Sequence, residues 1–282
     1  MTATRFDRFI TLRVIPYTER LFGRPDTSAI PILMYHSISD LESSFPHPYY
    51  ETRTSPKAFE EQMKFLNEAG YYSIDLSELP AAIENETSER RPVVITFDDG
   101  FKDFLTNAFP VMEKYGFTAT VFLATGMMGL KSDMFGGKET LDWNDVRELR
   151  KRGVTFGSHT VNHPILKKLE IEEVEAEVKE SKIEIQSRLG EVVETFSYPL
   201  AFPEERGNFL KKYFGILERC GYRFGLTTII GRVGKGDNLL ALKRLPVNDH
   251  DDTALFKAKL EGAYDWVHVP QYLRKKCFGW ID

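Results

Sequence analysis

The chain has 282 residues and a formal net charge of −5, with 42% hydrophobic and 28% charged residues. A chain of this length can bury about three quarters of its unfolded surface, so a complete hydrophobic core is available. The acidic balance argues against a general nucleic-acid binder, and the two cysteines, Cys220 and Cys277, are too few for a disulfide scaffold.

The N-terminal residues 5–24 combine five arginines with apolar side chains at Phe6, Phe9, Ile10, Val14, Tyr17 and Leu21. Two interpretations stay open: a helix that lies on a membrane surface, or a terminal helix packed on the domain. Pro16 argues against one long helix. We recognise no secretory signal and no segment long enough to cross a bilayer. The sequence therefore predicts a cytoplasmic protein, with peripheral contact to the inner face of the membrane as an option.

Short β-rich runs alternate with helical patterns along the rest of the chain. The expected strands are Ile30–Tyr35, Val93–Phe97, Ala119–Ala124, Val154–Gly157, Thr195–Tyr198, Phe224–Thr228 and Ala241–Leu245, with Tyr72–Leu76 as an eighth. The expected helices are Pro56–Ala69, Phe101–Tyr115, Trp143–Arg152, Glu172–Leu189 and Asn208–Cys220. This alternation predicts a parallel sheet in an α/β fold, either a TIM-like barrel or, as the second choice, a doubly wound open sheet.

Polar residues follow several of these strands directly. His36 ends PILMYH, Asp98 and Asp99 end VVITFDD, His159 ends VTFGSH, and Pro199 ends TFSYP. The carboxyl ends of parallel strands meet on one side of such a fold, where α/β enzymes carry their chemistry. We therefore expect these residues to gather at one mouth.

Two of these strings together indicate a metal site. His159 and His163 are spaced i and i+4, and imidazole with carboxylate suits Zn²⁺, Co²⁺, Ni²⁺ or Mn²⁺. One carboxylate of the Asp98-Asp99-Gly100 turn can bind the ion while the other accepts a proton from the attacking water. Taken singly, the turn and the histidine pair have ordinary structural explanations; together they favour a metal-dependent hydrolase.

TFDDG followed by SHTVNHP resembles the first two motifs of the polysaccharide deacetylases, the NodB-homology group also called carbohydrate esterase family 4. The resemblance extends from about Ile30 to Trp266 and implies a distorted (β/α)₇ barrel that deacetylates N-acetylated sugars with a divalent metal, commonly zinc. It further implies that Asp99, His159 and His163 are the metal ligands and that Asp98 is the general base. The backbone N–H of Leu200, after Pro199, would help to hold the oxyanion.

The general acid is less directly assigned, because the family often carries it in a late Leu-x-x-His motif. The C-terminal part offers only His250 and His268. His250 lies in a hydrophilic run and could instead form a second metal cluster with Asp249, Asp251 and Asp252. We predict that His36 is the general acid, because it stands at the end of an apolar strand. This arrangement resembles the circularly permuted branch of the family that deacetylates biofilm poly-N-acetylglucosamine.

The third family motif is altered: Phe196 occupies its Arg position and Leu200 its Tyr position. The partner expected to orient Asp98 is therefore missing, and Arg244, at another predicted strand end, is the candidate replacement. A surface arginine is the alternative. Because of this departure from the family motif, substrate specificity is the family property that transfers least to this chain.

Aromatic side chains suit sugar faces, so Tyr35, Trp143 and Tyr198, with Pro199, are candidate substrate contacts, as are Tyr49 and Tyr50. We expect a helical extension over residues 1–28, a catalytic domain over 29–270 and a C-terminal tail over 271–282. The predicted activity is removal of an N-acetyl group from a poly- or oligosaccharide or its precursor. An O-acetyl esterase, a degenerate glycan-binding member and a metal phosphoesterase are the alternatives.

Overall fold

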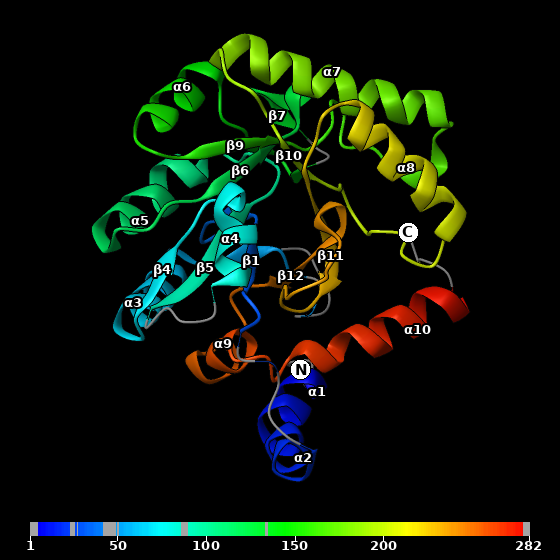
Figure 1. Cartoon of the computed structure of the whole chain (residues 1–282). Coiled ribbons are helices and arrows are strands. Elements are labelled where there is room, and N and C mark those ends of the chain that lie inside the picture. The colour runs from blue at the N-terminus through cyan, green and yellow to red at the C-terminus, as the bar shows by residue number, and fades with distance from the viewer. Residues whose placement is uncertain are drawn as a thin grey trace.

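Seven parallel strands close into a barrel in the computed structural model (Figure 1). The structure describes residues 5–278 except 23–25, 27, 42–48, 50, 86–89 and 133–134. The barrel strands are β1 (Ile32–Tyr35), β5 (Arg91–Phe97), β6 (Thr120–Leu123), β9 (Thr155–Ser158), β10 (Thr195–Ser197), β11 (Phe224–Ile230) and β12 (Leu242–Pro246). Their spatial order is β1-β12-β11-β10-β9-β6-β5, and β5 pairs with β1 again.

The pairing of β1 with β5 closes the barrel, so the predicted (β/α)₇ architecture is confirmed and the open sheet is excluded. The eighth expected strand is present as β4 (Tyr71–Ser73). It pairs only with the first three residues of β5, and β6 pairs with the last two. The barrel is therefore distorted at this point, where two strands share one edge of β5. Two short pairs lie outside the barrel: β2 (Ser37–Ile38) with β3 (Arg53–Thr54), and β7 (Lys131–Ser132) with β8 (Lys138–Glu139).

Helices surround the barrel in Figure 1. Their bounds are α1 Phe6–Phe9, α2 Ile15–Phe22, α3 Pro56–Glu68, α4 Leu79–Glu84, α5 Phe109–Tyr115, α6 Trp143–Lys151, α7 Ile171–Leu189, α8 Gly207–Arg219, α9 Thr253–Leu260 and α10 His268–Phe278. Several begin at residues that can accept hydrogen bonds from free backbone N–H groups. Asp142, for example, caps α6 by accepting from the N–H groups of Asn144 and Asp145.

Two π-helical segments precede prolines inside helices. Ile10–Val14 joins α1 to α2 just before Pro16, and Phe104–Ala108 leads into α5 just before Pro110. A proline lacks the N–H that an α-helix needs, and the wider π turn takes up that defect without ending the helix. The expectation that Pro16 prevents one long helix was therefore wrong: the backbone is helical from Phe6 to Phe22, with a change of hydrogen-bond register.

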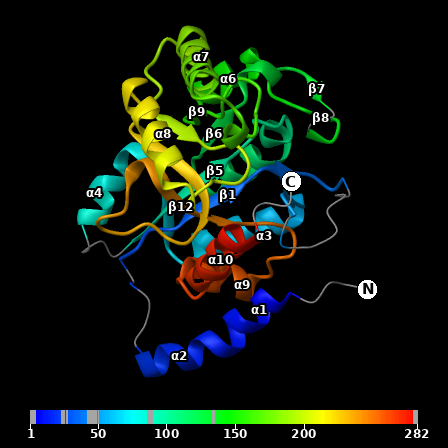
Figure 2. The ribbon, with the colours of Figure 1, turned by 90° about the vertical axis from the view of Figure 1, so that its right-hand side faces the viewer.

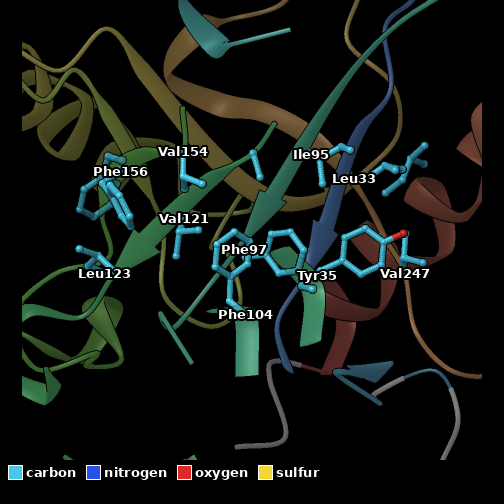
Figure 3. Packing of buried hydrophobic residues seen from close by; sticks show 14 of the residues in the cluster. Leu33, Tyr35, Ile95, Phe97, Phe104, Val121, Leu123, Val154, Phe156 and Val247 are labelled. Atoms are coloured by element: carbon cyan, nitrogen blue, oxygen red, sulfur yellow. The ribbon is translucent and has the colours of Figure 1, made fainter. Parts of the chain in front are cut away.

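The main hydrophobic core lies between the barrel and its helices. Figure 3 shows the rings of Tyr35, Phe97 and Phe104 side by side, and the centroids of the last two are 4.7 Å apart. Neighbouring residues on a strand point to opposite faces, so Thr96 points into the barrel while Phe97 points out. Inside, the guanidinium of Arg244 donates to the hydroxyls of Thr96 and Ser197. These side chains come from β12, β5 and β10 and form a polar layer below the mouth.

The expected domain limits at 28 and 270 stay predictions, and the residues 1–4 and 279–282 of the two outer segments lie outside the described residues. Helix α10 runs across the expected boundary at residue 271, and Lys275 in its last turn is buried. No helix in the described part of the chain has the length and apolar character needed to cross a bilayer.

Candidate active site

The three predicted metal ligands converge at the mouth of the barrel. Asp99 follows β5, and His159 and His163 lie in the segment after β9. One ligand atom from each lies within 4.8 Å of the others. The Oδ1 atom of Asp99 is 3.4 Å from Nε2 of His159 and 3.3 Å from Nε2 of His163. Two separate strand ends thus deliver one compact group of a carboxylate and two imidazoles.

The backbone around this group is strained. Among the described residues, positive φ without glycine occurs at Asp99 (69°), Thr160 (70°), His163 (53°) and Leu200 (57°), all of them in segments that follow β5, β9 or β10. A side chain with a Cβ adopts such angles at a cost, and such residues cluster at functional sites. At Asp99 the left-handed turn breaks the alternation of β5, which lets two consecutive carboxylates, Asp98 and Asp99, serve the same mouth.

The ring of His159 is held in one orientation. Its Nδ1 lies 2.8 Å from the backbone carbonyl of Ser197, which leaves Nε2 directed to Asp99. A carbonyl acceptor fixes the proton on Nδ1, so Nε2 offers its lone pair, as metal-ligating histidines require. His163 is held by packing instead: the ring of Phe135 meets it edge to face at 5.5 Å.

The turn that carries both histidines is tied to helix α7. One oxygen of Glu177 accepts hydrogen bonds from the N–H groups of Val161 (2.8 Å) and Asn162 (2.9 Å), and the other accepts from the Asn162 side chain. The N–H of His163 donates to the hydroxyl of Thr160 at 3.0 Å. These contacts hold the i, i+4 pair in the one conformation that brings both rings to Asp99.

The group fits a divalent cation. Oδ1 of Asp99 is buried and has no hydrogen-bond partner, although two imidazole nitrogens lie nearby. A buried, unpartnered carboxylate oxygen is costly unless a further group satisfies it. Two nitrogens and one oxygen form a common three-ligand set for Zn²⁺ and related transition metals, and such a set leaves coordination open for water or substrate. Asp99, His159 and His163 would therefore hold the ion.

Burial and neighbouring charges set the protonation of these groups. Burial alone raises the pKa of Asp98 and of Asp99, but the charge of Arg244 on the first and the imidazoles on the second hold both below their ordinary range. Burial lowers the pKa of His163 to about 4, and the protonated form of the neighbouring His159 acts in the same direction. Burial also tends to lower the pKa of His159. The carboxylates of Asp99 and Asp98 outweigh this effect, so the pKa of His159 is raised.

Arg244 fills the top of the barrel interior and is completely buried. Its two terminal nitrogens donate to the two oxygens of Asp98 at 2.8 and 2.7 Å, and its Nε donates to the Thr227 carbonyl at 2.9 Å. Planar two-point pairing of this kind fixes both the charge and the direction of a carboxylate. Arg244 is therefore the partner of Asp98 that the altered third motif lacks, and the alternative of a surface arginine is excluded.

His36, which follows β1, lies partly buried beside the cluster. Burial lowers its pKa, and the charges of Asp99 and Asp98 oppose that effect. The chain directly after it is clamped by Asp103, which accepts from the Ser37 hydroxyl and, at 3.1 Å, from the N–H of Ile38. Asp103 thereby limits the movement of the backbone that carries His36.

Leu200 lies on a loop that the C-terminal helix holds in place. The N–H of Phe202 donates to the Thr228 hydroxyl at 3.0 Å, and the Lys275 ammonium donates to the Phe202 carbonyl at 3.1 Å. Lys275 also pairs with Glu204 at 2.9 Å, and His268 pairs with the other oxygen of Glu204 at 2.8 Å. His268, considered above as a possible acid, is therefore engaged in this clamp.

Three aromatic residues predicted to meet sugar do not reach the site. Tyr35 is fully buried against α3 and donates to Gln62, and Tyr198 is buried and donates to the Leu240 carbonyl. Trp143 packs on the core with the Arg188 guanidinium 5.5 Å above its ring. The expectation for these rings was wrong because they point outward from the barrel or are already covered.

The remaining candidates divide as follows. Pro199 is buried after β10, and Tyr49 packs at the edge of the core; Tyr50 lies outside the described residues. In the described part of the chain, Asp99, His159 and His163 are the one group of three metal-ligating side chains whose ligand atoms converge, so the suggested cluster around His250 does not form a metal site there. Asp249, Asp251 and Asp252 instead pair with Arg53, Lys259 and Arg8.

The sequence did not predict the residues that hold the site in place through hydrogen bonds and ion pairs. Ser197 could have been found, because strand alternation places it inside the barrel between Phe196 and Tyr198. Asp103, Glu177, Glu204 and Lys275 carry no local signal, since their partners are 15 to 73 positions away in the chain.

The chain is similar to several proteins whose names describe deacetylases. The polysaccharide deacetylase family pattern matches residues 85–225. The polysaccharide deacetylase-like protein YxkH of Bacillus subtilis is 32% identical over 236 residues, which are 82% of this chain and 76% of YxkH. The poly-β-1,6-N-acetyl-D-glucosamine N-deacetylase of Escherichia coli K12 is 29% identical over 46% of this chain and 20% of its own length. The structure of the Streptococcus pyogenes deacetylase PplD, bound to acetate, matches with a TM-score of 0.69 and 27% identity, over 82% of this chain and 98% of PplD. The chain therefore belongs to the polysaccharide deacetylase family.

Proposed function

We propose that this protein hydrolyses the N-acetyl group of an amino sugar in a poly- or oligosaccharide, or in its precursor, with Zn²⁺ as the first-choice metal. The observation that carries the proposal is the convergence of Asp99, His159 and His163 beside a second carboxylate, Asp98, which Arg244 holds in place. Amide hydrolysis needs an activated water, a place for negative charge on the carbonyl oxygen and a proton for the leaving amine.

A divalent cation at the three ligands supplies Lewis acidity, which polarises an acetamide carbonyl and makes water a better nucleophile near neutral pH. Asp98 is the general base in this proposal. Arg244 keeps it ionised and directs its carboxylate, and burial excludes competing solvent. His36, which follows the neighbouring strand β1, is the proposed acid that returns the proton to the amine nitrogen.

The N–H of Leu200 is the proposed donor to the developing oxyanion. The positive φ of this residue turns the peptide out of the strand direction of β10, and the clamp from Lys275 and Thr228 keeps the loop fixed. A donor that is already in position costs no reorganisation when charge develops.

The relatives support an N-acetylated substrate. The Escherichia coli relative acts, by its name, on poly-β-1,6-N-acetyl-D-glucosamine, and it shares with this chain a matched stretch of 140 residues. We therefore propose an N-acetylglucosamine-containing glycan as the substrate class. The experiment incubates the purified protein with N-acetylglucosamine oligomers and added Zn²⁺ or Co²⁺. The expected result is loss of one acetyl group by mass spectrometry, abolished by a chelator. Loss of acetyl only from O-acetylated sugars, or from none, would refute the proposal.

A pair of variants at Leu200 tests the oxyanion donor. Leu200→Gly keeps the N–H and removes the backbone strain, so we expect activity within about twofold of the wild type. Leu200→Pro removes the N–H and cannot adopt the positive φ, so we expect kcat to fall about 100-fold or more. Steady-state acetate release measures both. Equal activity of the two variants would show that a group other than the Leu200 N–H donates to the oxyanion.

A further inference from the structure

The helical segment from Phe6 to Phe22 is attached to the body by its polar side. Figure 2 shows α1 and α2 along the lower edge of the molecule, with α9 and α10 above them. Four polar contacts hold the segment and the preceding Arg5 to residues just before α9 and α10: Arg5 with Asp251, Tyr264 with Asp7, Arg8 with Asp252, and Trp266 with Thr11. The buried side of this segment is thus largely hydrogen-bonded and ion-paired.

The other side of the segment is apolar and exposed. The exposed fractions are 68% for Phe6, 55% for Phe9, 41% for Val14 and 65% for Tyr17. Arg13 is exposed among them. We call Phe6, Phe9, Arg13, Val14 and Tyr17 the outer face. A helix on a globular protein ordinarily turns its apolar stripe to the core, whereas this segment leaves four large apolar side chains exposed. An exposed apolar face of this kind marks an interaction surface.

The charge around the outer face indicates what covers it. Residues 5–24 contain five arginines against two acidic residues, although the whole chain has a net charge of −5. Asp7, Arg5 and Arg8 are already paired within the molecule, whereas Arg13 is exposed on the outer face. The neighbouring helix α10 also exposes Val269, Leu273, Arg274 and Lys276 and contains no acidic residue. The covering partner should therefore be apolar and anionic.

We propose that the outer face binds the surface of a bilayer that contains anionic lipid, with the segment lying along the interface. Aromatic rings and aliphatic side chains enter the boundary between headgroups and acyl chains, while Arg13 pairs with a lipid phosphate. Two copies of this chain are less suited to each other here, because a twofold contact would bring the same cations together. The inference is independent of the catalytic proposal, since no residue of the outer face belongs to the site.

Vesicle sedimentation of the full chain tests this proposal. The vesicles contain either phosphatidylcholine alone or phosphatidylcholine with about one third phosphatidylglycerol. We expect clear binding to the anionic vesicles, weakened by high salt because surface charges are screened. Phe6→Ser combined with Phe9→Ser should weaken the binding about tenfold or more, since two exposed rings lose their apolar burial. Arg13→Glu should weaken it only where anionic lipid is present.

The matched control carries Ile183→Ser and Val192→Ser, two residues that are 53% and 75% exposed on and after α7, away from the outer face. It should bind like the wild type, and circular dichroism should show all variants folded. Equal binding by the Phe6/Phe9 variant, or no preference for anionic vesicles, would overturn the proposal. So would light scattering that shows a wild-type dimer converted to a monomer by the same variant, because the face would then join two copies.

Discussion

Asp98→Asn is expected to lower kcat for acetate release by about 100- to 10,000-fold, the range that general acid–base groups contribute. Asparagine has nearly the shape of aspartate but cannot accept a proton near neutral pH. Asp98 is not one of the three ligands that converge on a common point, so the variant should keep its metal. Steady-state kinetics and elemental analysis on the same preparation measure the two properties separately.

Asp99→Asn provides the matched comparison, since it changes the neighbouring carboxylate in the same way. It should lose metal as well as activity, because Oδ1 of Asp99 is the atom that both imidazoles approach. If Asp98→Asn remained active, or lost metal as Asp99→Asn does, the assignment of base and ligand to these two residues would be wrong.

Arg244→Met is expected to have the largest effect on stability. It leaves the Asp98 carboxylate buried with neither of its two guanidinium bonds, and removing one partner of a buried pair costs about 3–5 kcal/mol. The free energy of unfolding in urea measures this loss. Activity should fall too, because the base would lose its direction and the charge that keeps it ionised.

The double variant Asp98→Asn with Arg244→Met distinguishes two contributions of Arg244 to stability, its ion pair with Asp98 and its packing in the barrel. It removes both charges, so its free energy of unfolding should recover part of the loss, as expected when groups are coupled. Purely additive losses would show that Arg244 supports the barrel by filling space and not by pairing with Asp98.

The alternation of strands and helices was sufficient to predict a parallel α/β sheet, with a barrel as first choice over an open sheet, and the family resemblance implied the seven-stranded barrel. The polar residues at strand ends predicted the mouth. The convergence of Asp99, His159 and His163 follows from those strand ends meeting on one side, which is a rule of parallel sheets. The absence of the family's arginine at Phe196 predicts a replacement partner for Asp98, and Arg244 stands at another predicted strand end. Its burial depends on the barrel being closed.

The errors at Tyr35 and Tyr198 have a common physical cause. Tyr35 and Tyr198 were assigned to the mouth because they stand near a strand end, but side chains alternate along a strand. Their neighbours His36 and Ser197 take the inward or mouth-facing positions, which leaves the tyrosines in the outer core. The supporting residues Asp103, Glu177 and Lys275 were out of reach for a different reason, because their contacts join segments that only the tertiary fold brings together.

Metal content per chain is the most direct test of the central claim that Asp99, His159 and His163 form one cation site. Protein dialysed against Zn²⁺ and freed of excess metal should contain about one ion per chain by elemental analysis. His159→Ala should lose most of it, whereas His250→Ala, in the region that the structure excludes as a metal site, should retain it. Full metal content in His159→Ala, or none in the wild type, would contradict the account.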